Sequence, residues 1–320
     1  MPDVLDPQWL GRRVSVRRIT GRRPDGRPTF RDVVGDLIRL DANVAIVETT
    51  GGAVEVAPDT VAAARLAPPS TADELALEAV AARGWRAAET AQLGGWLLRG
   101  DGGFTGRANS VLPLRAPGVP IGEALATARG WYASRGLPLR IHVPTEARRL
   151  LDADLGERGW PAGDLVHVMA ARLDAVSAGE SAPEVEVTIA ERPDDAWLAR
   201  FRDGAVPTER ARALLSRHER VGFATIRDGA LTLAIGRACV DDTWLGISAV
   251  EVDPAFRRQG LAHTVLRALW SWGRNRGATR SYLQVGADNP GAVALYERVG
   301  YWVHHDYRYR TEPESADAPA

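Results

Sequence analysis

The sequence predicts a protein of the α/β class, in which a mixed sheet with helices is preceded by a small all-β module. Three observations predict this. Short runs rich in Val, Ile and Thr fill residues 8–67, a pattern typical of strands. Beyond them, strand-like runs alternate with runs of helical spacing. Two stretches of this larger part also repeat each other at a fixed distance, which indicates two copies of one βαβαβ unit.

The composition is that of a soluble globular protein, with 45% hydrophobic and 25% charged residues. The net charge of −1 excludes a polycation that binds nucleic acid through its overall charge. Every one of the 40 basic Lys or Arg positions is arginine. Cys239 is the one cysteine, so no intramolecular disulfide can form. Because there is no apolar signal core and no run of the roughly 20 apolar residues that a membrane helix needs, we expect a cytoplasmic protein without a membrane partner.

Residues 8–67 contain several short β-type runs, and the glycines at 51 and 52 predict a tight hairpin between the last two. The runs are residues 14–19, 33–40, 44–49 and 53–56. Such strands in so small a segment predict a five-stranded SH3- or Tudor-like β-barrel. Arginines crowd its start, at Arg12, Arg13, Arg17, Arg18, Arg22, Arg23 and Arg27. A patch for nucleic acid or an acidic partner is one interpretation; we favour a solvated charged face, because few aromatic residues interleave the arginines and acidic residues follow.

Two mixed blocks follow, at residues 72–173 and 185–310, separated by a linker at 176–183 that is rich in Ala, Ser, Gly and Glu. In the middle block we expect helices at 73–83, 121–135 and 146–155, and strands at 94–99, 108–114, 139–143 and 165–172. In the last block we expect helices near Trp197 and at 208–216, 260–276 and 291–299, and strands at 222–226, 231–240, 243–252, 281–285 and 304–310.

The repeat has a spacing of 141 residues. Residues 131–136, WYASRG, correspond to residues 272–277, WGRNRG, and the pair Gly-Trp at 159–160 lies the same distance before Gly-Tyr at 300–301. We therefore predict that the middle block is a second, diverged copy of the last block.

The strongest local signal is residues 252–263, VDPAFRRQGLAH. A strand ends at Val252, and Pro254 cannot continue a central strand. Gly260 and Ala262 then open a helix, and their small side chains let an anion approach the backbone. Since the first turn of a helix has unpaired N–H groups and the positive end of the dipole, this segment predicts a pyrophosphate site.

The segment also supplies positive charge, because Arg257 and Arg258 can bind phosphate oxygens. Arg257, Gly260 and Ala262 match the Arg/Gln-x-x-Gly-x-Gly/Ala signature of the GCN5-related N-acetyltransferase (GNAT) superfamily. Downstream, residues 289–301, NPGAVALYERVGY, match its second signature, Asn-x-x-Ala-x-x-Leu-Tyr-x-x-x-Gly-Phe/Tyr. With both signatures in the right order, the last block closely resembles this superfamily, and the middle block resembles it weakly.

The resemblance implies a GNAT acyltransferase fold, acetyl-CoA as co-substrate and a role for each matching residue. The backbone of Val250 and Val252 would bind the pantetheine arm, and Asn289 would bond the same region. Tyr296 would protonate the leaving thiolate as the general acid. Its helical spacing would also suit a core tyrosine, but the match to the motif favours catalysis. Backbone amides would hold the pyrophosphate at Arg258, Gln259, Gly260, Leu261, Ala262 and His263.

In such enzymes a neutral amine attacks the thioester directly, so we do not expect Cys239 to act as a nucleophile. A base must remove a proton from the amine. Glu251 lies in the right strand but could equally be solvated, and Glu219 and Asp242 are no better supported. The run His-His-Asp at 304–306 could suggest a metal site; we expect none, because alternate strand residues face opposite sides and no third ligand cluster is evident.

The middle block carries a degenerate loop. The positions that correspond to Arg257, Gly260 and Ala262 are Ala116, Val119 and Ile121, and two prolines among them remove N–H donors. Tyr296 corresponds to Leu155. We therefore expect this block to be structural or to form one wall of the acceptor pocket.

The glycine-flanked residues 103–110 of the middle block are either a plain turn or a means of directing Arg107 and Asn109 toward a substrate carboxylate. The layout resembles an actinobacterial group of tandem GNAT proteins in which some members synthesise N-acetylglutamate, which implies a small amino acid such as glutamate as acceptor. The alternatives are a protein or peptide acetyltransferase whose barrel recruits the target, and a non-catalytic acyl-CoA sensor. Retention of Asn289 and Tyr296 argues against the sensor.

Overall fold

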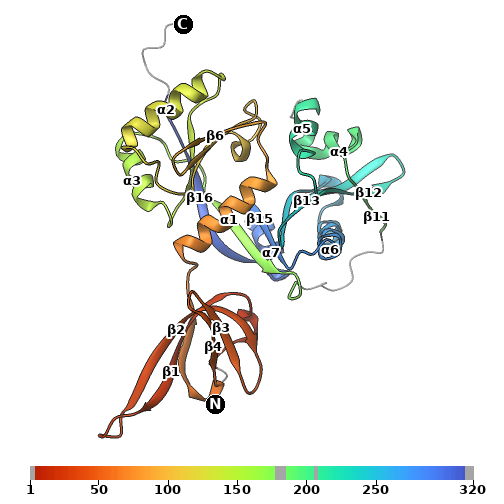
Figure 1. The fold of residues 1–320 in the computed structure, drawn as a ribbon. Coiled ribbons are helices and arrows are strands. Elements are labelled where there is room, and N and C mark those ends of the chain that lie inside the picture. The colour runs from red at the N-terminus through yellow and green to blue at the C-terminus, as the bar shows by residue number, and fades with distance from the viewer. Residues whose placement is uncertain (1–3, 177–184, 205–207, 314–320) are drawn as a thin grey trace. The chain divides into compact units, whose positions relative to one another are not determined.

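The computed structural model describes residues 4–176, 185–204 and 208–313 (Figure 1). The chain divides into two compact units, Met1–Ser70 and Thr71–Ala320. The predicted linker at 176–183 lies outside the described residues except for Val176.

The first unit is a five-stranded antiparallel sheet in the order β4-β3-β2-β1-β5. Its strands are β1 (Arg13–Arg22), β2 (Pro28–Leu40), β3 (Ala45–Thr49), β4 (Gly52–Val56) and β5 (Val61–Leu66). Along β1, Val14 and Val16 are fully buried while the residues between them are not, which is the alternation expected of a sheet with one apolar face. The predicted hairpin joins β3 and β4, where Thr49 pairs with Gly52.

The predicted SH3- or Tudor-like barrel is wrong, because the sheet does not close. Among the described residues no pairing joins β4 to β5, so both strands are edges. Strand β5 was also not predicted, since its sequence VAAARL carries little β-branched character.

The second unit is built on an 11-stranded mixed sheet, in the order β11-β12-β13-β14-β15-β10-β16-β9-β8-β7-β6. Its strands are β6 (Glu89–Leu93), β7 (Trp96–Gly100), β8 (Val111–Pro113), β9 (Arg140–Pro144), β10 (Val166–Arg172), β11 (Val187–Ala190), β12 (Val221–Asp228), β13 (Leu231–Asp241), β14 (Trp244–Val252), β15 (Arg280–Gly286) and β16 (Trp302–Thr311). Its helices are α1 (Thr71–Gly84), α2 (Ile121–Ala133), α3 (Arg149–Glu157), α4 (Asp195–Arg200), α5 (Thr208–Leu215), α6 (Leu261–Arg274) and α7 (Pro290–Arg298).

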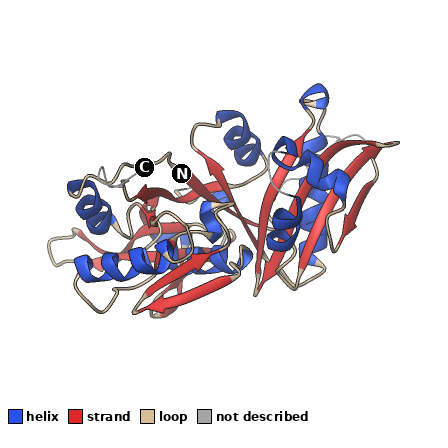
Figure 2. Ribbon diagram, turned by 90° about the horizontal axis from the view of Figure 1, so that it is seen from above, coloured by secondary structure: helices blue, strands red, loops and turns tan. Residues whose placement is uncertain are grey.

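The mixed α/β class and the predicted helices are confirmed, whereas the edge strands β6 and β11 were not predicted. Helix α6 packs one face of the sheet, burying Val265, Leu266 and Leu269 in a core that includes β13 and β14. Trp197 of α4 and Phe223 of β12 are buried in a second core on the other side of the same strands. Figure 2 shows helices on both sides of these strands. The element pattern repeats, since α3 and α7 begin at Arg149 and Pro290, 141 residues apart.

The two halves of this sheet exchange strands at its centre. Strand β10, from the middle block, pairs antiparallel with β15 of the last block. Strand β16, the last strand of the described residues, pairs antiparallel with both β10 and β9, and Figure 1 shows it reaching the half that carries α2 and α3. Residues 71–313 thus share one continuous sheet, and their division into domains at 72–173 and 185–310 stays a prediction.

A buried acid lies at this centre. Oε1 of Glu78, on α1, lies 3.0 Å from Nε2 of His142 on β9 and 3.0 Å from Nε2 of His305 on β16. Burial alone would raise the pKa of Glu78, but the adjacent His142 and His305 hold that pKa well below its usual range. The residues 304–306 that hinted at a metal site therefore have structural partners. Within the described ranges no three or more His, Cys, Asp and Glu side chains gather where a metal ion could bind.

Candidate active site

Strands β14 and β15 part halfway along their length. They pair in parallel from Trp244 and Arg280 to Ile247 and Leu283, yet both strands continue beyond the last pair. On its other side β14 stays paired with β13 as far as Val252. One edge of β14 therefore offers backbone groups that no strand of the described part satisfies, which is how an extended ligand can be held by main-chain hydrogen bonds.

A β-bulge marks the point where the strands part. The pairing of β13 with β14 slips between Ile235 and Arg237, so that Gly236 faces two residues, Ala249 and Val250. Ala249 has φ 53°, a left-handed conformation that non-glycine residues rarely adopt. Bulges of this kind re-aim backbone groups and are frequent beside active sites.

The side chains of the parted segment of β14 face two different cores. Val250 and Val252 pack toward α6 and α7, and Ala249 packs on the opposite face with Trp85 and Phe104. The backbone contacts predicted for Val250 and Val252 stay predictions, with the unpaired edge of β14 beside them.

The loop after β14 ends at an uncapped helix. Arg257, Arg258, Gln259 and Gly260 are exposed, and α6 starts at Leu261 with no side-chain hydrogen bond at its N-cap, Gly260. Gly260 has φ 81° and Arg258 has φ 61°, so the backbone turns sharply just ahead of the helix. An exposed loop of arginines that leads into a helix N-terminus without a capping side chain fits the pyrophosphate of acetyl-CoA.

The loop is fixed at its base by Asp253. This residue accepts a hydrogen bond from the backbone N–H of Ala255 at 2.9 Å and forms an ion pair with Arg200 of α4. At the start of α6, Ala262 is half-buried and His263 is buried, with its ring 6.0 Å from that of Trp270.

Asn289 caps α7. Its Oδ1 accepts a hydrogen bond from the N–H of Ala292 at 3.1 Å, which explains the residue type locally. No partner for its Nδ2 lies among the described residues, so this donor can still serve the predicted pantetheine contact.

Tyr296 is 9% exposed and belongs to the core beneath α6 and α7. Its ring lies edge-on to that of Tyr301, with 6.0 Å between centroids. Among the described residues its hydroxyl has no hydrogen-bond partner, and burial raises the pKa of Tyr296 to about 12. The hydroxyl is therefore protonated at neutral pH, as a general acid must be.

Glu251 is half-buried and is held by a neighbouring turn. Its Oε2 accepts a hydrogen bond from the backbone N–H of Arg202 at 2.9 Å. Arg202 has φ 52°, so the backbone is bent to place this N–H. The contact orients the carboxylate, and the role of Glu251 as base stays a prediction.

The structure also brings together residues that the sequence did not connect. A small cavity of about 80 Å³ opens where β14 and β15 part, lined by Gly246 to Ala249, Tyr282 and Gln284 on the sheet and by Trp85 and Arg107 from the middle block. Arg237 and Cys239 of β13 complete its wall. The one signal in the sequence was Arg237 itself, a charge inside the apolar run LTLAIGRACV.

For residues 103–110, where a plain turn and a substrate contact by Arg107 and Asn109 were both open, the structure places the two side chains differently. Arg107 lines the cavity, but Asn109 folds back on its own turn. Its Oδ1 accepts from the N–H groups of Asp101 and Gly103, at 2.6 and 2.9 Å, and its Nδ2 donates to the carbonyl of Thr105 at 2.8 Å. These bonds use both ends of the amide, so Asn109 shapes the turn that carries Arg107.

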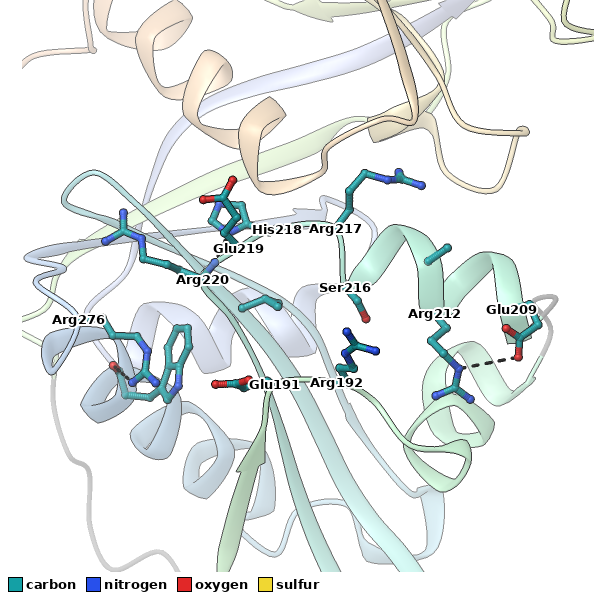
Figure 3. A pocket seen from close by; sticks show the side chains of 13 residues that line it. Glu191, Arg192, Glu209, Arg212, Ser216, Arg217, His218, Glu219, Arg220 and Arg276 are labelled. Carbon is teal, nitrogen blue, oxygen red and sulfur yellow. Dashed lines mark hydrogen bonds and ion pairs between the residues drawn. The ribbon is translucent and has the colours of Figure 1, made fainter.

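A larger pocket, of about 640 Å³, lies elsewhere (Figure 3). Its wall includes Trp272 and Arg276, whose guanidinium lies 4.2 Å from the Trp272 ring. Because α6 has 14 residues, this end of the helix is about 21 Å from Gly260. This charged pocket is therefore separate from the loop that precedes Gly260. Its other charged members are Glu191, Arg192, Glu209, Arg212, Arg217, His218, Glu219 and Arg220.

Comparison with known proteins agrees with this geometry. Residues 71–310 match the family described as "Probable histone acetyltransferase Rv0428c C-terminal". Residues 8–65 match "Rv0428c N-terminal Sm-like domain", so the first unit is Sm-like and the SH3-like prediction is corrected. None of the described helices combines the length and apolar character needed to cross a bilayer.

Two relatives are similar over most of the chain. The "Probable histone acetyltransferase Rv0428c" of Mycobacterium tuberculosis is 35% identical over 310 residues, which cover 94% of each chain. The "Uncharacterized N-acetyltransferase YobR" of Bacillus subtilis is 30% identical over 241 residues, covering 73% of this chain and 96% of its own.

Solved structures share the fold at lower identity. A GCN5-related N-acetyltransferase from Kribbella flavida superposes with a TM-score of 0.58 at 21% identity, over 76% of this chain and 96% of its own. A tandem GNAT protein from the clavulanic acid biosynthesis pathway gives a TM-score of 0.54 at 15% identity, over 78% and 91%. The chain thus belongs to the Rv0428c acetyltransferase family and is an N-acetyltransferase of the GNAT type.

Proposed function

We propose that this protein transfers the acetyl group of acetyl-CoA to a primary amine. The observation that carries the proposal is the parting of β14 from β15 directly before the loop at Gly260. The free edge of β14 would hold the pantetheine arm through Val250 and Val252, and the N–H groups from Arg258 to His263 would hold the pyrophosphate. Arg257 adds positive charge, and Asn289 offers its Nδ2. Acetyl-CoA, when bound, supplies the thioester.

Two residues of the chain would transfer protons during the reaction. Glu251 accepts a proton from the attacking amine, directly or through water, because its carboxylate is oriented by the Arg202 N–H. Tyr296 donates a proton to the leaving sulfur. The attack needs no enzyme nucleophile, and burial raises the pKa of Cys239, which disfavours its reactive thiolate. We place the reaction in the cytoplasm, where such a buried free thiol stays reduced.

Calorimetry with acetyl-CoA, followed by free-thiol release with an amine panel, tests the proposal. We expect saturable binding and amine-dependent release of CoA. A well-folded protein that takes up no acetyl-CoA would refute the proposal. Binding without turnover of any amine would instead support the acyl-CoA sensor.

The acceptor is an amine of a small amino acid, such as glutamate, or of a protein. The protein alternative is favoured by two relatives, a probable histone acetyltransferase and, over 82 residues at 33% identity, a ribosomal protein bS18-alanine N-acetyltransferase of Escherichia coli. Under that alternative the Sm-like unit recruits the target. Since each unit has its own sheet and core, removal of residues 1–70 should spare turnover of a small amine and reduce turnover of a recruited protein.

A further inference from the structure

We propose that the acceptor is an amine that also carries a carboxylate, and that Arg107 and Arg237 bind this carboxylate in the cavity beside the parted strands. The inference rests on the acetyltransferase function proposed above and names the substrate class of the same site. It excludes, as the preferred acceptor, the lysine side chain of a basic protein.

The cavity lies on the side from which an acceptor must come. The backbone edge of β14 and the uncapped start of α6 would bind the co-substrate, and α6 and α7 pack against Val250 and Val252. The cavity is lined instead by Ser248 and Ala249, and Ala249 packs toward the opposite core. Glu251 follows Ala249 by two residues along β14, so a bound amine can meet both the base and the cavity.

The two arginines differ in how firmly they are held. Arg237 is 1% exposed and is fixed by neutral acceptors: its Nε donates to the Leu215 carbonyl at 2.9 Å and its Nη2 to the Gly84 carbonyl at 3.0 Å. Its Nη1 faces Ser248 Oγ at 3.4 Å. Arg237 is therefore a fixed positive charge in the wall of the cavity.

Arg107 is half-buried and under-satisfied. Its buried Nε has no hydrogen-bond partner, and its Nη2 reaches the Gln284 carbonyl only at 3.5 Å. Its other neighbours are the ring of Trp85 at 5.1 Å and the Tyr307 hydroxyl, which shares a hydrogen bond with it. The positive charge of Arg202 also acts on Arg107. Of the five N–H donors of a guanidinium, the one on Nε of Arg107 has no acceptor and one on Nη2 has a long contact.

The cavity holds positive charge without a counter-charge. No acidic residue is among its lining residues, and neither Arg107 nor Arg237 forms an ion pair in the part of the chain that the structure describes. Both guanidinium groups lie near the Trp85 ring, with their carbons 5.1 Å and 5.2 Å from its centroid. Because buried charges are normally paired, this arrangement calls for an anion from outside the chain.

A carboxylate fits this arrangement best. The planar guanidinium binds a carboxylate through two parallel hydrogen bonds, and the cavity has room for a group of only a few heavy atoms. A lysine ammonium on a basic protein would instead bring more positive charge toward two uncompensated arginines.

The test compares acceptors that differ in one charge. With acetyl-CoA saturating, kcat and KM are measured for L-alanine, L-glutamate, alaninamide and a basic lysine-containing peptide. We expect kcat/KM for the better of the two carboxylates to exceed that for alaninamide and for the peptide by about tenfold or more, the usual effect of a charge-assisted hydrogen bond. In Arg107→Gln, KM for the carboxylate should rise by a similar factor while kcat changes little. Arg107→Lys, which keeps the charge but not the fork, should lie between.

Arg115→Gln is the matched control, because Arg115 is an exposed arginine of the same block outside the cavity; it should behave as wild type. If the wild-type enzyme acetylates alaninamide or the peptide as efficiently as either amino acid, the inference is overturned and the acetyl-transfer proposal still stands. An unchanged KM in Arg107→Gln would overturn it as well. If acetyl-CoA does not bind at all, the acetyltransferase proposal fails first, and this inference falls with it.

Discussion

Replacing Tyr296 with phenylalanine should separate catalysis from folding. The substitution keeps the ring, which is 9% exposed and packs against Tyr301. It removes a hydroxyl that has no hydrogen-bond partner among the described residues, so no buried group is orphaned. We therefore expect the free energy of unfolding to change by less than about 0.5 kcal/mol.

The expected effect on turnover is much larger. A positioned general acid contributes roughly 10²–10⁴-fold to a rate, which is about 2.7–5.4 kcal/mol of transition-state stabilisation. Tyr296→Phe should lower kcat by at least about 100-fold, with the Kd for acetyl-CoA unchanged. Steady-state release of CoA gives kcat, and calorimetry gives the Kd.

Tyr301→Phe is the matched control, because the Tyr301 hydroxyl, unlike that of Tyr296, forms hydrogen bonds with described residues. That hydroxyl accepts a hydrogen bond from Trp270 Nε1 at 3.0 Å and donates one to Ser281 Oγ at 2.6 Å. Its loss leaves the indole N–H buried without an acceptor and should lower the free energy of unfolding by about 1–3 kcal/mol. Its kcat should stay at the wild-type value. Equal kcat values for wild type and Tyr296→Phe would show that another group, or water, protonates the sulfur.

Three other changes test the loop, the centre of the sheet and a buried histidine. Gly260→Val and its control Gly277→Val force valine into similar left-handed conformations, φ 81° and 86°, at opposite ends of α6, and each should lower the free energy of unfolding by about 1–2 kcal/mol. Only Gly260→Val should weaken acetyl-CoA binding measured by calorimetry. Equal Kd values for the two variants would count against a pyrophosphate site at Gly260. Glu78→Ala should cost about 3–5 kcal/mol in urea unfolding, because two buried histidine rings lose their shared carboxylate, and a cost under about 1 kcal/mol would contradict that role. Burial lowers the pKa of His218 to about 4, so between about pH 6.5 and pH 4 the unfolded chain binds a proton that the native state does not. The free energy of unfolding should therefore fall as the pH drops through this window, and His218→Asn should reduce the slope by up to about 1.4 kcal/mol per pH unit. An unchanged slope would mean that His218 does not cause it.

The turn after β14 and helix α6 could be predicted because their signals are local. Pro254 stops a strand, Gly260 permits a left-handed turn, and the apolar spacing of α6 follows within one helix length. The cavity could not be predicted in the same way. Arg107 and Arg237 are 130 residues apart in the sequence, and only the packing of the middle block on β13 and β14 brings them together.

The errors have physical reasons as well. Strand β6, ETAQL, is a short edge strand with a single β-branched residue, Thr90, and no run of apolar residues to mark it. Closure of the first unit into a barrel depends on how strongly its strands curl, which alternation of apolar residues does not report. For Asn109 the sequence left a plain turn and a substrate contact open, and its bonds to Asp101, Gly103 and Thr105 show the turn-building role that asparagine often takes.

The exchange of β10 and β16 has a consequence for how this chain acquires its shape during synthesis. The half that is translated first lacks a central strand until β16 has left the ribosome, so its β9 and β10 edges stay open while the other half is being made. A chain that lacks β16 would leave edges of β9 and β10 exposed, and exposed strand edges favour aggregation. The half that is made first therefore depends on a strand from the far end of the described residues to complete its sheet.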